Sequence, residues 1–296
     1  MRCGFVSIVG RPNVGKSTLL NNLIGEKLAI TSPVSGTTRN IINGIYNDDD
    51  SQIIFIDTPG IHKPKHKLDN LLNKKSYDNF YGVDIILFLI DAESGYGRGD
   101  EFILDKIKDI DAKKFIILNK IDKIKDKSKI IKVIDDVKDK YDFDEIIPIS
   151  ALKDTSELLK EIKKYLPVRN KIYEDEDFTN VSTRFIMSEY VREKLLLLTH
   201  DEIPHSISCY TEYFKDRGKT VDIKVLIVVD RDNIKKIVIG KGGSLLKKVG
   251  IEARRDMEKF LGKKVMLETY VKTIDNWRDE VKYFKELGLD DEDNWC

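Results

Sequence analysis

The sequence has few of the features that mark a secreted or membrane-spanning protein. Its only cysteines are Cys3, Cys209 and Cys296, and their separation fits no metal-ligand spacing. No apolar run approaches the ~20 residues that a membrane-spanning helix needs. The first ten residues, MRCGFVSIVG, enter a strand pattern at once, which leaves no room for a signal peptide. We therefore expect a cytosolic protein with reduced thiols.

The sequence also lacks a net charge. Its 51 Lys and Arg residues balance its 51 Asp and Glu residues, so the total charge indicates no partner and only its local distribution can. An apolar content of 41% and a charged content of 34% are typical of a folded globular protein. A chain of 296 residues is long enough for two domains, each with its own core.

The first part of the chain alternates short apolar runs with helical stretches. Continuous apolar strands separated by helices predict a mainly parallel sheet with helices on both faces, which is the α/β class. A short connection between the second and third runs predicts an antiparallel hairpin at the sheet edge. The predicted strands are residues 5–10, 41–47, 52–57, 84–92, 114–122 and 145–150.

The pattern then changes, because residues 167–183 are polar and have no clear period. Beyond them we predict a helix, two strands, two helices flanking a glycine-rich loop, a third strand and a last helix from about Asn276. This is a small α+β unit with its helices on one side of three strands. The predicted domains are 1–168 and 182–296, joined by a linker at 169–181.

The first glycine-rich loop, GRPNVGKS at Gly10–Ser17, follows a predicted strand and opens a helix. Its G-x-x-x-x-G-K-S spacing is that of a phosphate loop. The glycines let backbone N–H groups converge on a β-phosphate, and the helix N-terminus favours negative charge. We expect Lys16 to reach the β- and γ-phosphate oxygens and the Ser17 hydroxyl to bind Mg²⁺. This loop alone does not separate ATP from GTP.

The segment NKID, at 119–122, lies at the end of another predicted strand, on the edge where such sheets bind ligands. The Asp122 carboxylate can accept from N1–H and the N2 amine of guanine, whereas adenine lacks the amine and has a lone pair at N1. An unpaired buried polar group costs ~1–3 kcal/mol, so this carboxylate favours guanine. Asn119 can join the base loop to the phosphate loop, and the Lys120 stem can cover the ring. SALK, at 150–153, fits a backbone contact to guanine O6.

Two further segments fit the γ-phosphate side of such a site. Asp57 of DTPG (57–60) ends a strand and can hold Mg²⁺ through water, while the Gly60 N–H can meet the γ-phosphate. In SGTTRN (35–40) a threonine can coordinate Mg²⁺ when the γ-phosphate is present, and we favour Thr38 over Thr37. Loss of that phosphate would release both loops, which is an order–disorder switch.

The second glycine-rich loop, IGKGGS at 239–244, lacks the G-K-[ST] ending and follows a helix. Helix–GxxG–helix beside a three-stranded sheet is the pattern of a KH domain, whose loop clamps about four nucleotides of RNA backbone. Residues 231–264 contain eleven Lys and Arg but only four Asp and Glu, so this region is basic. The alternative is a helix–turn–helix corner whose glycines serve packing. The predicted RNA-binding residues are Ile239, Gly240, Lys241, Gly242, Gly243, Lys247, Lys248 and Arg254.

Together, the motifs resemble the translation-factor-related class of small GTPases. With the second domain, the chain is similar over essentially its whole length to the Era family of bacterial ribosome-assembly GTPases. This resemblance implies a P-loop GTPase domain followed by a type II KH domain. The predicted nucleotide-binding residues are Gly10, Arg11, Pro12, Asn13, Val14, Gly15, Lys16, Ser17, Thr18, Asp57, Thr58, Pro59, Gly60, Asn119, Lys120, Asp122, Ser150, Ala151 and Leu152, with Ser17, Thr38 and Asp57 at Mg²⁺.

The catalytic residues expected are Lys16, Thr38, Gly60 and Asn13. Ile61 stands where Ras-like GTPases have a glutamine that orients the attacking water. The resemblance implies a hydrophobic residue here and a water organised elsewhere, for which a monovalent cation is one candidate. Asn13 matches the asparagine with which related GTPases hold K⁺, although it can also simply brace the loop. We expect slow GTP hydrolysis that is faster in K⁺ than in Na⁺.

The expected function is therefore a GTP-driven switch that binds RNA. The resemblance adds the RNA's identity, a single-stranded segment near the 3′ end of small-subunit ribosomal RNA, and a role in 30S subunit maturation. We expect a cytoplasmic monomer, with peripheral association at the cytoplasmic membrane as a further property of relatives. The alternatives are a P-loop ATPase or nucleotide kinase, a membrane-surface protein, and a passive RNA-binding module whose nucleotide is only structural.

Overall fold

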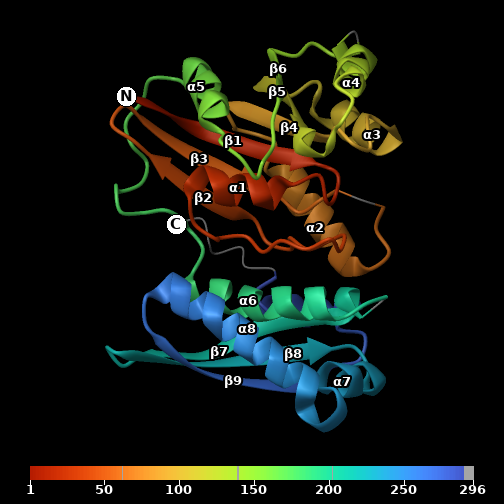
Figure 1. Cartoon of the computed structure of the whole chain (residues 1–296), viewed down its shortest axis with the longest axis vertical. Coiled ribbons are helices and arrows are strands. Elements are labelled where there is room, and N and C mark those ends of the chain that lie inside the picture. The colour runs from red at the N-terminus through yellow and green to blue at the C-terminus, as the bar shows by residue number, and fades with distance from the viewer. Residues whose placement is uncertain (62, 139, 202, 290–296) are drawn as a thin grey trace. The chain divides into compact units, whose positions relative to one another are not determined.

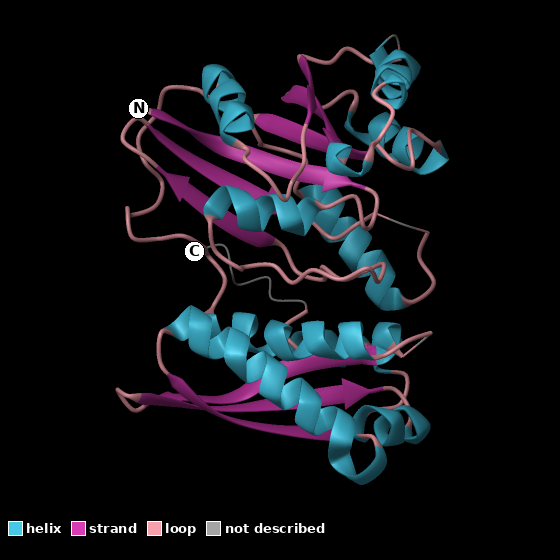
Figure 2. Ribbon diagram, in the orientation of Figure 1, coloured by secondary structure: helices cyan, strands magenta, loops and turns pink. Residues whose placement is uncertain are grey.

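The computed structural model describes residues 1–61, 63–138, 140–201 and 203–289, and it divides the chain into two compact units. The first comprises residues 1–29, 38–63 and 72–180, and the second comprises 30–37, 64–71 and 181–296. Each unit has its own sheet (Figures 1 and 2). Two short excursions of the amino-terminal half, 30–37 and 64–71, thus belong to the second unit by their packing.

The first unit contains a six-stranded sheet in the order β2-β3-β1-β4-β5-β6. Strands β1, β3, β4, β5 and β6 run parallel, while β2 pairs antiparallel with β3, so the predicted edge hairpin is confirmed. Phe88 and Leu89 point to opposite faces, yet neither is exposed to solvent, as expected for a parallel sheet covered on both sides. The strands are β1 (Arg2–Gly10), β2 (Ile42–Asn47), β3 (Ser51–Asp57), β4 (Ile85–Asp91), β5 (Lys113–Asn119) and β6 (Glu145–Pro148).

The helices that cover this sheet are amphipathic. In α3, the apolar residues Ile103, Leu104 and Ile107 recur at helical spacing and are buried against β4 and β5, while α5 buries Leu158 and Ile162. The helices are α1 (Lys16–Ile24), α2 (Lys67–Asp78), α3 (Arg98–Ile107), α4 (Ser128–Lys138) and α5 (Ser156–Tyr165), with a 3₁₀ turn at Ile121–Lys123. Helix α2 begins in the excursion assigned to the second unit and ends in the first.

Two predicted strands are too long at their carboxyl ends: the strand predicted at 145–150 ends at Pro148 in β6, and the strand predicted at 114–122 overruns further. The apolar run at 114–122 predicts a strand through Asp122, but β5 ends at Asn119. Lys120 has a left-handed backbone with φ of 67°, and the 3₁₀ turn follows it. Residues 120–122 of the NKID segment therefore leave the strand at the carboxyl edge of the sheet. Their side chains are not held in the alternating positions of a strand.

The second unit is an α+β layer, as predicted. Its sheet has the order β7-β8-β9, with β8 antiparallel to β7 and parallel to β9. Helices α6 and α8 lie on one face of it (Figure 1). The Ser182 hydroxyl caps α6 by accepting from the Phe185 N–H. The elements are α6 (Thr183–Leu198), β7 (Ile207–Asp216), β8 (Thr220–Val229), α7 (Asp232–Ile239), α8 (Ser244–Leu261), β9 (Lys264–Thr273) and α9 (Val281–Glu286), with 3₁₀ turns at Pro204–Ser206, Lys241–Gly243 and Trp277–Asp279.

The last helix begins later than Asn276. That residue has a left-handed φ of 52°, a 3₁₀ turn follows it, and α9 starts only at Val281. The buried Trp277 indole explains the interruption, because it donates a hydrogen bond to the Ser206 carbonyl at 3.0 Å and so holds the turn in place.

Cys3 and Cys209 are buried and free, while Cys296 lies outside the described residues. Within the ranges given above, no helix is both long and apolar enough to span a membrane.

Candidate nucleotide site and glycine-rich RNA loop

The phosphate loop is a tight turn between β1 and α1. Gly10 and Gly15 have positive φ angles of 152° and 103°, and a Cβ on Gly15 would lie 2.3 Å from the Asn119 side-chain nitrogen. Asn13 also has a positive φ, of 64°. Helix α1 begins at Lys16, so the first N–H groups of the helix have no partner within it. The loop therefore presents a concave set of backbone donors that suits phosphate.

The Lys16 side chain is buried at the mouth of this loop. Its ammonium donates to the carbonyl oxygens of Gly10 and Arg11, both at 3.1 Å. Burial lowers the pKa of Lys16, and the nearby Asp57 carboxylate partly offsets that effect. An anion bound in the loop would stabilise the charged ammonium further, which is the role that a phosphate-binding lysine has.

Three oxygen-bearing side chains converge beside Lys16. The Ser17 hydroxyl donates to Asp57 Oδ2 at 2.7 Å and lies 3.0 Å from the Thr38 hydroxyl, which is itself 3.5 Å from Asp57 Oδ2. Asp57 Oδ1 is buried and has no hydrogen-bond partner in the described chain. Burial raises the pKa of Asp57 to about 6, against the opposing effects of Lys16, Ser17 and Thr38. Hard oxygen donors with one uncompensated carboxylate oxygen fit Mg²⁺.

The neighbouring threonine points elsewhere. The Thr37 hydroxyl donates to the Val34 carbonyl at 2.6 Å and lies 2.7 Å from the Ser32 hydroxyl. Thr38, which the sequence favours, is the threonine whose hydroxyl lies with Ser17 and Asp57.

Asn119 joins three loops at the carboxyl edge of the sheet. Its amide donates to the Val14 carbonyl at 2.7 Å, and its Oδ1 accepts from the Ala151 N–H at 2.8 Å. The Lys120 ammonium donates to the Asn13 carbonyl at 2.7 Å. The expected connection between the base loop and the phosphate loop is therefore present in the structure.

The side chains that would meet the base are solvent-exposed. Asp122 is exposed, and its pKa is lowered chiefly by the Ser150 hydroxyl, so the carboxylate is ionised at neutral pH. Leu152 is 75% exposed, which leaves its side chain open to contact with a flat ring. The Ala151 N–H already donates to Asn119, so a contact to guanine O6 from this loop would need another donor.

The segment after β3 approaches the phosphate loop closely. The Thr58 hydroxyl donates to the Ile8 carbonyl at 3.2 Å, and a Cβ on Gly60 would lie 3.0 Å from the Pro12 ring. Gly60 therefore has little room for any side chain. Ile61 is buried in the core of the first unit, so its side chain cannot orient a water molecule.

Three residues that support the site were not predicted from the sequence. Asp91, at the end of β4, pairs with the Lys120 ammonium at 2.7 Å. The fully buried Asp100 pairs with Arg11 at 2.8 Å, which draws that side chain toward α3. The Asn22 amide donates to the carbonyl oxygens of Ala151 and Lys153, at 2.9 and 2.5 Å. Asp91 could have been found, because it ends a strand as Asp57 does.

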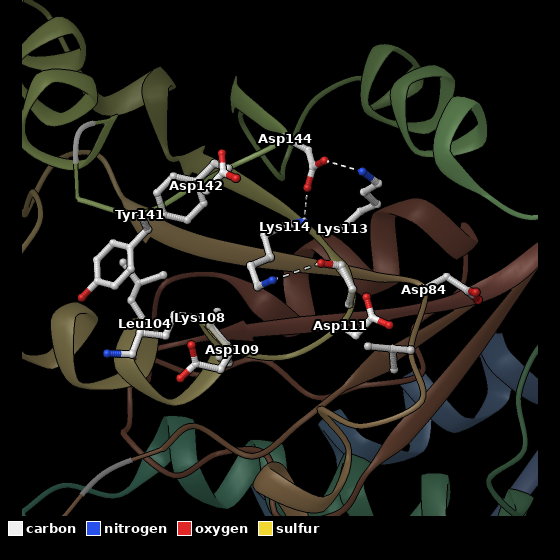
Figure 3. Close-up of a pocket in the computed structure, with 14 residues that line it drawn as sticks. Asp84, Leu104, Lys108, Asp109, Asp111, Lys113, Lys114, Tyr141, Asp142 and Asp144 are labelled. Atoms are coloured by element: carbon white, nitrogen blue, oxygen red, sulfur yellow. Dashed lines mark hydrogen bonds and ion pairs between the residues drawn. The ribbon is translucent and has the colours of Figure 1, made fainter.

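A polar cavity of about 580 Å³ lies near the opposite edge, where β4 and β5 begin (Figure 3). Two of its lysines have partners: Lys113 pairs with Asp144 at 2.8 Å, and Lys114 donates to the Ile110 carbonyl at 2.7 Å. Ligands of open α/β sheets bind outside the carboxyl ends of the strands, so this cavity is not the nucleotide site.

The second glycine-rich loop joins α7 to α8. Gly240, Gly242 and Gly243 have φ angles of 75°, 60° and 78°, and a Cβ on Gly240 would lie 2.8 Å from the Leu245 nitrogen. The structure places the loop beside an exposed cationic surface, with Ile239 half-buried behind it. The four cations predicted to bind RNA, Lys241, Lys247, Lys248 and Arg254, are all exposed.

Two family models match the chain, one in each unit. The 50S ribosome-binding GTPase family matches residues 5–120, and the KH domain family matches residues 202–278. These matches agree with the phosphate loop in the first unit and the GxxG loop in the second.

Curated and solved relatives match nearly the whole chain. GTPase Era of Lacticaseibacillus paracasei is 44% identical over 293 residues, which cover 98% of this chain and 97% of that protein. A crystal structure of Era with MgGDPNP and nucleotides 1506–1542 of 16S ribosomal RNA has a TM-score of 0.94 at 41% identity, covering 98% of this chain and 99% of that one. A variant of Aquifex aeolicus Era bound to GDP·AlF4⁻ gives the same values. The chain belongs to the GTPase Era family.

Proposed function

We propose that the chain is a GTP-hydrolysing switch that binds small-subunit ribosomal RNA near its 3′ end and assists maturation of the 30S subunit. Domain 1–168 binds and hydrolyses GTP, and domain 182–296 binds the RNA. The observation that carries the proposal is the convergence of Ser17, Thr38 and Asp57 oxygens next to a buried phosphate-loop lysine, in a chain that also has an exposed GxxG loop. The Era structure with MgGDPNP and a 16S RNA segment supports both halves.

Within this proposal, different residues of the first unit bind the phosphates, the Mg²⁺ ion and the base. Lys16 and the loop N–H groups neutralise and orient the phosphates, and the Gly60 N–H donates to the γ-phosphate. Ser17, Thr38 and Asp57 hold Mg²⁺, which supplies positive charge to the β- and γ-phosphate oxygens when bound. Asn119 fixes the base loop, and Asp122 selects guanine. Because Ile61 is buried and apolar, it gives no help to the attacking water, and slow turnover follows.

Asn13 is the residue through which K⁺ would act. We propose that it holds a monovalent cation between the phosphates, so hydrolysis is faster in K⁺ than in Na⁺ at equal ionic strength. Asn13→Ala should lose this difference and about tenfold of the K⁺-supported rate, which corresponds to ~1.4 kcal/mol of barrier. Single-turnover phosphate release, measured in K⁺ and in Na⁺, gives the hydrolysis rate in each salt. Asn233→Ala is a distant control. Equal wild-type rates in both salts, left unchanged by Asn13→Ala, would remove the cation from the mechanism.

The GxxG loop should be sensitive to a single added methyl group. Gly240→Ala places a Cβ 2.8 Å from a backbone nitrogen at a left-handed φ, so the loop must shift. We expect RNA affinity to fall by roughly tenfold, or ~1.4 kcal/mol. Fluorescence anisotropy with an RNA matching nucleotides 1506–1542 measures this. Gly218→Ala, at a turn glycine of similar φ with open space around it, is the matched control and should bind as the wild type does.

We infer that the two excursions, 30–37 and 64–71, carry a coupling between nucleotide and RNA. The Thr37 carbonyl accepts from the buried Arg192 of α6, and the Thr31 N–H donates to Glu193 at 3.1 Å. One peptide bond separates Thr37 from Thr38, which lies with the candidate Mg²⁺ ligands. We propose that GTP, by ordering the loops at 31–40 and 58–70, changes RNA affinity through this connection. RNA must then raise the preference for GTP over GDP by the same factor.

The second excursion makes comparable contacts. Asp279 accepts from the Lys67 N–H at 3.0 Å and lies 2.9 Å from His66 Nδ1. The backbone hydrogen bond from Lys67 is the main reason that the pKa of Asp279 is lowered. A carboxylate that is ionised at neutral pH thus binds the start of α2.

The remaining part of the proposal concerns location and assembly. The resemblance supports a cytoplasmic monomer with K⁺-dependent turnover and peripheral association at the inner face of the cytoplasmic membrane. Flotation with anionic liposomes tests the membrane association, and sedimentation of the GTP-loaded and GDP-loaded protein tests the monomer.

A further inference from the structure

The proposed function gives no role to the face of the β7–β9 sheet that lies opposite α6. Cys209 and Thr211 of β7 point toward α6: both are buried, and the Thr211 hydroxyl donates to the Arg184 carbonyl at 2.8 Å. Side chains alternate along a strand, so Tyr210 points to the other face. The bulge between Thr211 and Tyr213 then restores Tyr213 to that same outer face, where it pairs with Lys224.

Strand register gathers three tyrosines there. Tyr210 pairs with Leu226 of β8, which pairs with Tyr270 of β9, so these three residues form one row across the sheet. Tyr213 heads the adjacent row. The tyrosines are 38%, 37% and 40% exposed in the order Tyr210, Tyr213 and Tyr270, whereas Leu226 between Tyr210 and Tyr270 is buried. Met266, on the same face, is 65% exposed.

Cations outnumber anions around these rings. Among outward positions the anions are Asp222 and Glu268, and both are neutralised, by Arg217 at 2.5 Å and by Lys224 at 2.7 Å. Lys215 and Lys272 are exposed, and neither forms an ion pair with another residue of the described ranges. Glu212 lies in the bulge, so strand alternation places its side chain on neither face. The outward lysines are Lys215, Lys224, Lys264 and Lys272.

We propose that this surface, the tyrosine face (Tyr210, Tyr213, Tyr270 and the flanking Lys215 and Lys272), binds single-stranded RNA. Bases would stack on the tyrosine rings while the lysines meet the phosphates, which is how sheet surfaces bind single strands without reading their sequence. The inference rests on the RNA-binding half of the proposed function and adds a second surface to it. The GxxG loop accommodates about four nucleotides, so only an RNA longer than that can use the tyrosine face as well.

The charge of the face favours RNA over a protein partner. A protein-binding patch is typically depleted of lysine at its centre, whereas Lys224 stands between Tyr213 and Glu268 in the middle strand. Unpaired Lys215 and Lys272 suit a polyanion, and the small area of apolar surface is enough for stacked bases.

The test compares two triple variants of the full-length protein. In the first, Tyr210, Tyr213 and Tyr270 become isoleucine, which keeps strand propensity and apolar burial but removes the rings. In the second they become phenylalanine, which keeps the rings. Affinities are measured for a single-stranded RNA of about four nucleotides and for one of about twelve, lengths chosen against the span of the GxxG loop.

We expect the isoleucine variant to bind the longer RNA at least tenfold more weakly, since one stacked base contributes roughly five- to a hundredfold. The phenylalanine variant should bind both RNAs as the wild type does, and the isoleucine variant should bind the short RNA normally. A Lys215→Glu/Lys272→Glu variant, altered only at exposed positions, should also weaken the longer RNA and does not depend on the isoleucine variant folding.

Two outcomes would overturn the proposal. The first is a folded isoleucine variant and a charge-reversal variant that both bind the longer RNA at wild-type affinity. The second is loss of binding to 30S subunits with unchanged affinity for free RNA, which would assign the face to a protein. Failure of the proposed function itself gives a different result. In that case Gly240→Ala would leave the affinities for both RNAs unchanged, or the wild-type protein would bind neither RNA.

Discussion

Replacing Asp122 with asparagine should transfer the preference of the protein from guanine to xanthine nucleotides. The carboxylate accepts from N1–H and the N2 amine of guanine, and each hydrogen bond to an ionised group contributes ~1.5–3 kcal/mol. Asparagine still accepts from N1–H but turns an NH₂ donor toward the N2 amine, so the loss of that one bond lowers GTP affinity by roughly 10- to 100-fold. Xanthine has a carbonyl oxygen in place of the amine, so the asparagine NH₂ can donate to it while the amide oxygen still accepts from N1–H. XTP should therefore bind the variant better than GTP does.

Competition titration of GTP, XTP and ATP against a fluorescent nucleotide measures the change. Asp142→Asn is the matched control, because Asp142 is exposed and lines the cavity near the amino ends of the strands. It should leave all three affinities unchanged. A wild-type protein that binds ATP as tightly as GTP would contradict the role of Asp122 and would favour the alternative of a P-loop ATPase or nucleotide kinase.

The parts of the fold that the sequence predicted are those with strong local signals. The run Ile85–Asp91 is apolar and rich in β-branched residues, so the strand predicted at 84–92 lies within one residue of β4 at each end. The errors occurred where backbone geometry depends on distant contacts. Asn276 turns left-handed next to a tryptophan that is hydrogen-bonded 71 residues away, and no local pattern signals this.

The residues of the candidate site also divide into those with a local sequence signal and those that depend on distant contacts. Motif spacing identified Lys16, Ser17 and Asn119, whose chemistry is local to each loop. It did not identify Asp100 or Asn22, because their partners lie 89 and 129 residues away and only the folded sheet brings them together. Buried charges were the hardest to foresee, since a polar residue in a helix is normally expected to face solvent.

Arg192 is the clearest case of such a buried charge, and its removal should have two separable effects. Its side chain is 2% exposed and makes two hydrogen bonds to Glu189, at 2.7 and 2.6 Å, in addition to the one to the Thr37 carbonyl. Arg192→Met leaves Glu189 buried and unpaired, which should cost about 3–5 kcal/mol of folding free energy. The double variant Glu189→Met/Arg192→Met replaces the ion pair with apolar groups of similar length, so its stability should be close to that of the wild type.

Both variants lose the hydrogen bond to Thr37, so both should lose the dependence of RNA affinity on nucleotide. In the wild type we expect RNA to bind roughly 5- to 150-fold more tightly with a non-hydrolysable GTP analogue than with GDP, a typical range for coupling between sites. In the double variant this ratio should approach one, and RNA should no longer change the preference for GTP over GDP. Arg184→Met, an exposed arginine on the same helix, is the control and should keep the wild-type ratio. A double variant as stable as the wild type that retains full coupling would show that the Thr37–Arg192 contact does not connect the nucleotide to the RNA-binding unit.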